Sequence, residues 1–285
     1  MKPTQMLRQL LAAPAAVVAP GAFDGLSARL VAQAGFHAVY ASGGAIARAA
    51  GYPDLGLLGV GEVLDRVEKI VQASGLPVIA DADTGFGGTP NVERTVRDFE
   101  RAGVAALHIE DQTFPKRCGH LDDKTLIPLD EMCRKVRIAR RTLSDPDCLV
   151  IARTDAIAVE GFEAALVRAQ AYADAGADML FVEAPETVAQ IEAIAARVPG
   201  PKLINMFHGG KTPLLPVQRL AEMGYRLVII PSDLQRAAIH AMQLTLAEIL
   251  KSGDSGALSG QMTSFAEREE IVQTRRYLEL DRLGG

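Results

Sequence analysis

The most regular pattern in the sequence is a run of apolar residues that follows a glycine at the end of an amphipathic stretch. It occurs four times, at 33–42, 101–110, 174–183 and 222–231. Glycine suits the end of a helix because it adopts positive φ without steric cost. The apolar runs are continuous rather than alternating, which is typical of parallel strands buried on both faces. Four similar runs lack the glycine turn, at 14–22, 76–83, 148–155 and 202–207.

The pattern therefore predicts eight strands, and amphipathic stretches of helical length alternate with them. These stretches are 24–34, 61–73, 91–102, 130–142, 161–175, 187–197, 213–223 and 233–250. Eight strand–helix units in about 250 residues match the size of a (β/α)8 barrel, the TIM barrel of the α/β class. A doubly wound sheet with extra strands is the alternative. No linker rich in Pro or Ser divides the chain, so we predict one domain over 1–285.

The segment 251–285 lies outside the count of barrel units. It begins with the flexible sequence KSGDSGALSG and ends in a charged stretch, 264–283, that has the pattern of a helix. Such a C-terminal helical extension could pack against its own barrel or reach a neighbouring subunit. The second arrangement would imply an oligomer.

Composition narrows the class of protein. Of 285 residues, 30 are Lys or Arg and 35 are Asp or Glu, and the resulting net charge of -5 argues against a nucleic-acid binder. No apolar run reaches the roughly 18 residues that span a bilayer, and the N-terminus lacks a clear signal sequence. Cys118, Cys133 and Cys148 show no CxxC spacing, and the last two are expected in the core. We predict a soluble, cytoplasmic protein.

Polar residues gather where the predicted strands end, which is where (β/α)8 barrels hold their working side chains. They are Tyr40, Ser42, Asp81, Asp83, His108, Glu110, Asp111, Arg153, Asp155, Glu183, Asn205 and Ser232. Residues two apart on a strand point to the same side, so Asp81 and Asp83 share a side. Buried carboxylates need a cation, and such oxygen ligands suit Mg²⁺ or Mn²⁺. Helix capping or salt bridging is the alternative role for these acids.

Two further features bear on chemistry. Arg153 could simply neutralise Asp155, or it could bind a substrate carboxylate in bidentate fashion.

The loop 114–124, FPKRCGHLDDK, places a lone Cys118 beside two cations and a histidine. We expect these neighbours to lower the pKa of the thiol and to make it active in proton transfer. Gly119 would let the backbone bend close to a ligand.

Six motifs resemble the isocitrate lyase/phosphoenolpyruvate mutase superfamily. They are YASGG (40–44), GYPDLGL (51–57), DADTGFGG (81–88), LHIEDQ (107–112), PKRCGH (115–120) and ARTDA (152–156). They occur in the family's order over about residues 16–250. The PKRCGH motif is specific to the carbon–carbon lyases, and the 2-methylisocitrate lyases and 2,3-dimethylmalate (2-alkylmalate) lyases are the most similar branch. The resemblance implies a (β/α)8 barrel whose last helix is exchanged within a homotetramer.

The resemblance also implies a role for each site residue. Asp81, Asp83 and Glu110 would hold Mg²⁺, with Mn²⁺ as a possible substitute, and Asp54 would act through water. The substrate would be bound by Tyr40, Ser42, Gly43, Gly44, Arg153, His108, Glu183 and Asn205. Lys116, Cys118, Gly119 and His120 would lie on a mobile loop that closes over the substrate.

The implied reaction cleaves a 2-hydroxy acid to pyruvate and a second carboxylic acid. Tyr40 is the candidate base for the hydroxyl proton, and Cys118 is the acid that protonates the carbanion formed by cleavage. An oxaloacetate decarboxylase or an oxaloacetate-hydrolysing enzyme on the same metal site is the alternative, although simple decarboxylation needs no such acid. A non-catalytic relative or one acting on P–C bonds is a third reading.

One departure from the family bears on the substrate. The segment 205–213, NMFHGGKTP, is nearer the alkylmalate pattern than that of the methylisocitrate lyases, which carry hydroxyls there. Phe207 would form an apolar wall where a third carboxylate would otherwise bind, and a carboxylate without donors is costly to bury. We therefore favour a dicarboxylate with an alkyl group, giving pyruvate and propionate. His208 stands where a Glu is usual and could instead hold a third carboxylate, which would give succinate.

Overall fold

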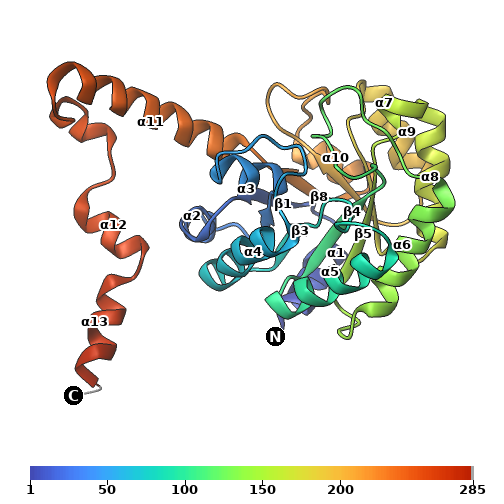
Figure 1. Cartoon of the computed structure of the whole chain (residues 1–285), viewed down its shortest axis with the longest axis horizontal. Coiled ribbons are helices and arrows are strands. Elements are labelled where there is room, and N and C mark those ends of the chain that lie inside the picture. The colour runs from blue at the N-terminus through green and yellow to red at the C-terminus, as the bar shows by residue number, and fades with distance from the viewer. Residues whose placement is uncertain (284–285) are drawn as a thin grey trace. The chain divides into compact units, whose positions relative to one another are not determined.

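The computed structural model describes residues 1–283 and contains a closed parallel barrel (Figure 1). Each strand pairs with the next along the chain, and the first pairs with the last. The strands are β1 (Val17–Ala22), β2 (Val39–Ala41), β3 (Val78–Asp81), β4 (Ala106–Glu110), β5 (Leu149–Thr154), β6 (Met179–Val182), β7 (Lys202–Asn205) and β8 (Tyr225–Ile230). The predicted (β/α)8 barrel is confirmed, and the doubly wound alternative is wrong.

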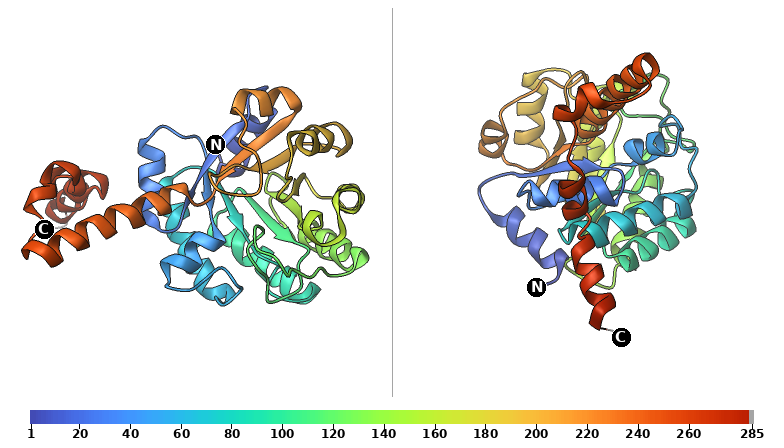
Figure 2. Two further views of the ribbon diagram at one scale, coloured as in Figure 1. Left: turned by 90° about the horizontal axis from the view of Figure 1, so that it is seen from above. Right: turned by 90° about the vertical axis from the view of Figure 1, so that its left-hand side faces the viewer.

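Helices connect successive strands and surround them (Figure 2). Those expected from the sequence are α2 (Gly25–Gln33), α4 (Val60–Ser74), α5 (Thr89–Ala102), α6 (Leu129–Thr142), α8 (Phe162–Asp174), α9 (Val188–Arg197), α10 (Val217–Met223) and α11 (Asp233–Ser252). Only α10 departs clearly from its predicted range, because it begins after Pro216 rather than at Pro213. Two short helices were not predicted, α3 (Gly43–Ala49) and α7 (Ile157–Glu160).

Helix α1 (Pro3–Ala12) covers the end of the barrel at which the strands begin, and the sequence analysis did not predict it. Its Leu7 is fully buried within the apolar core of the barrel. Arg8 donates to the carbonyl of Asp147, just before β5, with a distance of 3.0 Å from Nε. This end of the barrel is therefore closed by apolar packing, and chemistry is confined to the opposite end.

The barrel register decides which charged residues meet at the open end. In parallel pairing, Asp81 of β3 lies opposite His108 of β4, and Glu110 of β4 lies opposite Arg153 of β5. Deeper layers are apolar and include Ile79, which belongs to the core. The acids and cations that the sequence places at separate strand ends therefore form one neighbourhood.

The chain divides into two compact units, Met1–Asp233 and the part from Leu234 onward. The second unit consists of α11 (Asp233–Ser252), the 3-10 helix η1 (Gly256–Gln261), α12 (Phe265–Ile271) and α13 (Thr274–Leu283). The division falls after Asp233, the first residue of α11, whereas the predicted extension begins at residue 251 and ends outside the described residues. The predicted helix 264–283 is in fact two helices, because Gln273 adopts a φ of 60° between them. The prediction of one domain stays a prediction.

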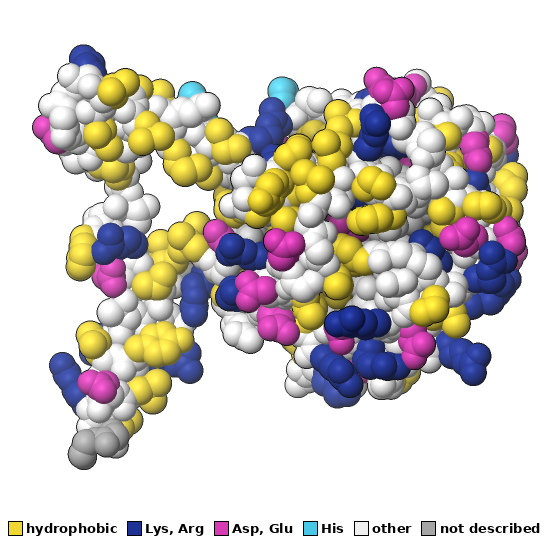
Figure 3. All heavy atoms as spheres, in the orientation of Figure 1, with side chains coloured by type: hydrophobic (Ala, Val, Ile, Leu, Met, Phe, Trp, Pro, Cys, Tyr) yellow, Lys and Arg dark blue, Asp and Glu magenta, His cyan; other side chains and the backbone are white. Residues whose placement is uncertain are grey.

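The helices of this second unit carry many exposed apolar side chains (Figure 3). Leu246 is 65% exposed, Leu250 is 90% exposed and Phe265 is 72% exposed. Side chains of this kind are rarely left in water along a whole helical segment. None of the helices within residues 1–283 combines the length and apolar character required of a transmembrane span.

Candidate active site

The predicted site residues do meet at the carboxyl ends of the strands. All of the following are buried there: Tyr40, Ser42, Asp81, Asp83, His108, Glu110, Arg153, Glu183 and Asn205. They come from β2 to β7 or from the residues that follow these strands directly. Asp54 and the segment 115–120 belong to two connecting loops that also reach this group.

Lys116 provides a positive charge among the acids. Its ammonium contacts Asp54 Oδ1 and lies 2.8 Å from Asp83 Oδ1. Asp83 has a φ of 47°, in the left-handed region that Asp tolerates better than most residues. Its backbone N–H donates to Asp81 Oδ1 at 3.0 Å, so the two acids predicted to act together are neighbours.

Burial and neighbouring charges shift the pKa values of the three carboxyl groups in the site. Burial raises the pKa of Asp83 to about 6, although the nearby Lys116 ammonium opposes this. Burial also favours the neutral form of Asp81, but the neighbouring His108, the cations Lys116 and Arg153 and a hydrogen bond from the Asp83 N–H outweigh it and hold the pKa of Asp81 at about 2. Burial raises the pKa of Glu110 well above its usual range. A bound cation would lower the raised pKa values of Asp83 and Glu110, because a nearby positive charge favours the carboxylate form.

The chemistry of these oxygens fits a hard divalent cation. Among the described residues, neither carboxylate oxygen of Glu110 accepts a hydrogen bond, although both are buried. Within residues 1–283, no three His, Cys, Asp or Glu side chains lie close enough together to form a metal site. The ammonium of Lys116 lies among the acids. The carboxylates of Asp81, Asp83 and Glu110 nevertheless offer only oxygen atoms as ligands, and Mg²⁺ prefers oxygen ligands.

Gly43 and Gly44 are glycines because carboxylates lie against them. A Cβ on Gly43 would come 2.7 Å from Asp81 Oδ2, and one on Gly44 would come 2.7 Å from Asp54 Oδ2. The backbone after β2 thus runs directly beside the acids. Ser42 precedes both glycines, and its Oγ accepts a hydrogen bond of 3.3 Å from the N–H of Ala45.

Tyr40 and His108 form a hydrogen-bonded pair within the mouth. The Tyr40 hydroxyl lies 2.8 Å from His108 Nε2 and 3.3 Å from Asp81 Oδ2. Burial lowers the pKa of His108, so its neutral imidazole can accept the Tyr40 proton. Burial also raises the pKa of Tyr40 well above its usual value, so the hydroxyl keeps its proton at neutral pH.

Arg153 connects three carboxylates. Its Nε donates to Asp155 Oδ2 at 2.9 Å and lies 3.2 Å from Glu110 Oε2. On its other side, Nη1 lies 3.8 Å from Glu183 Oε2. Arg153 therefore neutralises Asp155, and because it also faces the carboxyl ends of the strands it could bind a substrate carboxylate as well.

The loop 115–120 contacts this site directly. His120 Nε2 lies 2.9 Å from Glu183 Oε1, and Asn205 Nδ2 donates to the same oxygen at 3.3 Å. A Cβ on Gly119 would come 2.4 Å from Arg153 Nη2, so only glycine fits at this approach. The predicted loop residues and barrel residues therefore form one site.

The expected pKa shift of Cys118 is wrong in sign. Burial raises the pKa of the thiol, and the negative charge of Asp54 raises it further. The neighbouring cations that suggested a lower pKa are committed elsewhere, since Lys116 contacts Asp54 and Arg117 lies near Asp123. Cys118 therefore holds its proton at neutral pH, as a general acid must. Cys133 and Cys148 are buried in the core, as predicted.

A buried network lies behind Arg153, and of its members only Asp155 was given a role from the sequence, as a partner of Arg153. Asp111 Oδ1 accepts from the N–H of Asp155 at 2.9 Å, and Asp111 Oδ2 accepts from Thr154 Oγ1 and Tyr172 Oη, each at 2.7 Å. Asp111 and Asp155 were both among the polar residues that the sequence predicted at the strand ends. Asp155 contacts the Arg153 guanidinium directly, and Asp111 contacts Arg153 only indirectly, through the backbone N–H of Asp155.

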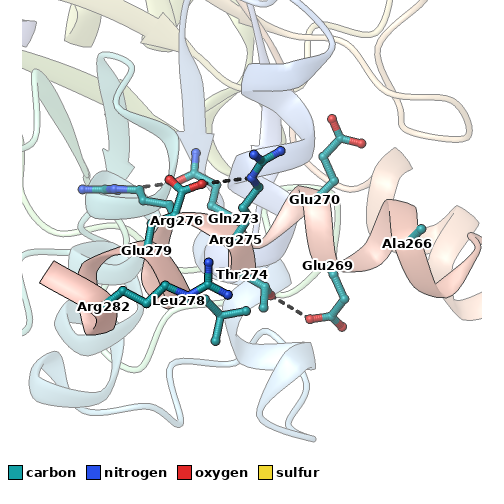
Figure 4. Close-up of a pocket in the computed structure, with 10 residues that line it drawn as sticks. All are labelled: Ala266, Glu269, Glu270, Gln273, Thr274, Arg275, Arg276, Leu278, Glu279 and Arg282. Carbon is teal, nitrogen blue, oxygen red and sulfur yellow. Dashed lines mark hydrogen bonds and ion pairs between the residues drawn. The ribbon is translucent and has the colours of Figure 1, made fainter. Parts of the chain in front are cut away.

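The second unit has a groove of its own along α12 and α13 (Figure 4). Its lining is mostly charged, and several of these groups pair locally. Thr274 Oγ1 donates to Glu269 Oε2 at 2.7 Å, and Arg275 Nε donates to Glu279 Oε1 at 2.9 Å. None of the predicted site residues lies there, so the barrel mouth is the candidate active site.

The fold and the site together define a (β/α)8-barrel enzyme. Its candidate active site is rich in buried carboxylates and is contacted by a loop that carries a cysteine. The profile of the phosphoenolpyruvate phosphomutase family matches residues 7–250. The chain therefore belongs to this family, within the phosphoenolpyruvate mutase/isocitrate lyase superfamily, and the predicted resemblance is confirmed.

Two similar curated proteins are carbon–carbon lyases. The chain is 41% identical to the 2,3-dimethylmalate lyase of Eubacterium barkeri over 283 residues, which is 99% of this chain and 98% of that protein. It is 42% identical to the 2-methylisocitrate lyase of Aeropyrum pernix, covering 98% of this chain and 90% of the relative. The prediction of a carbon–carbon lyase is confirmed at the level of its class.

Two similar solved structures are those of hydrolases. One is an oxaloacetate acetylhydrolase in complex with 3,3-difluorooxalacetate, with a TM-score of 0.93, 35% identity, and coverage of 100% of this chain and 97% of that chain. The other is a phosphonopyruvate hydrolase in complex with oxalate and Mg²⁺, with a TM-score of 0.90, 31% identity and 99% coverage of each chain. The same barrel therefore supports several reactions.

Proposed function

We propose that this protein is a Mg²⁺-dependent lyase that cleaves the C2–C3 bond of a 2-hydroxy dicarboxylic acid to pyruvate and a second carboxylic acid. The observation that carries the proposal is the position of Cys118. Its thiol holds a proton at neutral pH and lies on a loop that His120 joins to Glu183 in the barrel mouth. A reaction that ends by protonating a carbanion needs a proton donor of this kind.

Asp81, Asp83 and Glu110 would hold the metal, with Asp54 acting through water. When bound, the cation would neutralise charge on the substrate carboxylate and 2-hydroxyl and lower the pKa of that hydroxyl. The support is the chemistry of this oxygen cluster, in which burial raises the pKa values of Asp83 and Glu110 and both Glu110 oxygens are buried without a hydrogen-bond donor. Mn²⁺ would be an alternative because it takes similar ligands.

The backbone at Ser42, Gly43 and Gly44 would bind the carboxylate next to the 2-hydroxyl. Arg153 would orient the hydroxyl oxygen through its guanidinium, which Asp155 holds in a bidentate pair. Asn205, together with Glu183, would complete the substrate site. Such fixed donors act by orienting the reacting groups before the bond breaks.

Two proton transfers would complete the reaction. Tyr40 would take the hydroxyl proton while it passes its own phenolic proton to the neutral imidazole of His108, whose Nε2 lies 2.8 Å from the Tyr40 hydroxyl. Cys118 would then donate its proton to the carbon released by cleavage. Lys116 and His120 would position the loop, Lys116 through Asp54 and His120 through Glu183.

The substrate we favour carries two carboxylates and an alkyl group. Phe207 packs edge-on against His120 with ring centroids 4.7 Å apart, so an apolar ring stands beside the loop. A third carboxylate next to that ring would lose solvation without gaining a donor. His208 is the feature that would favour 2-methylisocitrate instead.

Product analysis tests the substrate. The protein and Mg²⁺ would be incubated separately with 2,3-dimethylmalate, 2-methylisocitrate and oxaloacetate, and the products identified by NMR. Pyruvate and propionate from dimethylmalate would support the apolar site, whereas pyruvate and succinate would refute it. Cleavage of oxaloacetate alone would refute the lyase and support the second candidate, which the 35% identical acetylhydrolase structure favours.

We also propose that the protein is a homotetramer in which the second unit is exchanged between subunits. The support is the row of exposed apolar side chains on α11, including Leu246 and Leu250. Light scattering on wild type and on Leu246→Glu/Leu250→Glu would test this, with dissociation of the double variant expected. A monomeric wild type would refute the proposal.

A cytoplasmic location without nucleic-acid or membrane partners stays a prediction.

A further inference from the structure

Lys124 is the last residue of the loop 114–124 and has no part in the proposed reaction. We infer that it is a positioning residue that fastens the loop 115–120 to the carboxylate that orients Arg153. Its ammonium donates to the carbonyl of Gly119 and, at 3.2 Å, to Asp155 Oδ1. One side chain therefore joins the loop to the barrel.

Asp155 is shared between two cations. Its Oδ1 accepts from Lys124 Nζ and from Arg153 Nη2 at 3.1 Å, and its Oδ2 accepts from Arg153 Nε at 2.9 Å. The Asp155 side chain is fully buried and that of Lys124 is 1% exposed. A buried carboxylate between two cations holds both in fixed positions, because either one would be costly to leave unpaired.

The Gly119 carbonyl is the part of this arrangement that can move away. Gly119 follows Cys118 directly, and its Cα packs against Arg153 and Glu183 so closely that no side chain fits. If the loop opened, Lys124 would lose its backbone acceptor and keep only Asp155. The closed loop is therefore favoured by a buried, charge-assisted hydrogen bond.

Lys202 offers a matched control. It is also a buried lysine that donates to backbone carbonyls, those of Val198 at 3.0 Å and Gly200 at 2.8 Å. It stands at the start of β7, the strand end away from the mouth. Lys124→Met and Lys202→Met therefore remove the same kind of group, and only the first touches the loop.

Limited trypsin digestion of the ligand-free protein tests the inference, with cleavage after Arg117 followed by mass spectrometry. Arg117 lies in the loop and its side chain is 47% exposed. Loss of a hydrogen bond from a charged donor shifts an opening equilibrium by about tenfold or more. We expect cleavage after Arg117 to be about tenfold faster in Lys124→Met and unchanged in Lys202→Met. Equal rates in Lys124→Met and wild type, or equal acceleration in both variants, would overturn the inference.

A kinetic comparison gives a second readout, and it rests on the proposed function. Because the loop delivers Cys118, Lys124→Met should lower kcat about tenfold while KM changes less. Lys202→Met should stay within about twofold of wild type in both constants. A Lys124→Met variant with wild-type kcat would contradict the role. If wild type turned over no substrate, the proposed function would fail, and digestion would still decide the role of Lys124.

Discussion

Replacing Gly119 with alanine adds one methyl group at the closest approach between the loop and the barrel. The new Cβ would come 2.4 Å from Arg153 Nη2 and 2.7 Å from Glu183 Cγ. Ordinary contacts of this type are about 3.4 Å or longer, so the loop would have to withdraw by roughly 1 Å. Gly119 does not have a positive φ, so the effect is steric and not a matter of backbone strain.

A displacement of about 1 Å in a positioned catalytic group costs on the order of 100-fold in rate. That corresponds to about 2.7 kcal/mol of transition-state stabilisation. The proton donor Cys118 is the neighbouring residue, so the loss should fall on kcat. Stability should fall by no more than about 1–3 kcal/mol, because the loop can open to relieve the contact and then loses only the hydrogen bond from Lys124 to the Gly119 carbonyl.

The assay is kcat by coupled detection of pyruvate, with the free energy of unfolding measured by urea denaturation on the same samples. Gly61→Ala is the matched control, because Gly61 lies in α4 and a Cβ there would meet no atom within 4 Å. It should keep full activity and gain about 0.5–1 kcal/mol of stability. A Gly119→Ala variant with kcat within threefold of wild type would refute the steric argument.

Three further predictions concern Cys118 and the network behind Arg153. Cys118→Ser should keep Mg²⁺-dependent pyruvate binding in calorimetry and lose most of kcat; near-normal turnover would remove the thiol from the mechanism. Because burial raises the pKa of Cys118, its alkylation by iodoacetamide should be slower than that of free cysteine at pH 8 and still rise above pH 9. A rate already constant below pH 8 would contradict this. Tyr172→Phe removes a buried donor to Asp111 and should cost about 1–3 kcal/mol in urea denaturation; an unchanged midpoint would contradict the role of that bond.

The sequence by itself determined the barrel and the composition of its mouth. Glycine-terminated amphipathic stretches followed by continuous apolar runs are local signals, and they do not depend on distant residues. Once the runs are parallel strands of one barrel, their ends must meet, so the convergence of Asp81, Glu110 and Arg153 follows from topology. The sequence did not predict helix α1, because this helix covers the far end of the barrel through contacts with residues that are distant in sequence.

Only the tertiary structure decided how the charges are shared. Along the chain, Cys118 has cations as neighbours, yet its pKa rises because the folded loop buries the thiol and brings Asp54 near. Asp155 is two residues from Arg153 in sequence, but its second partner, Lys124, is 31 residues away and reaches it through the loop. Desolvation and charge pairing depend on every atom within a few ångströms, and most of those atoms come from distant segments.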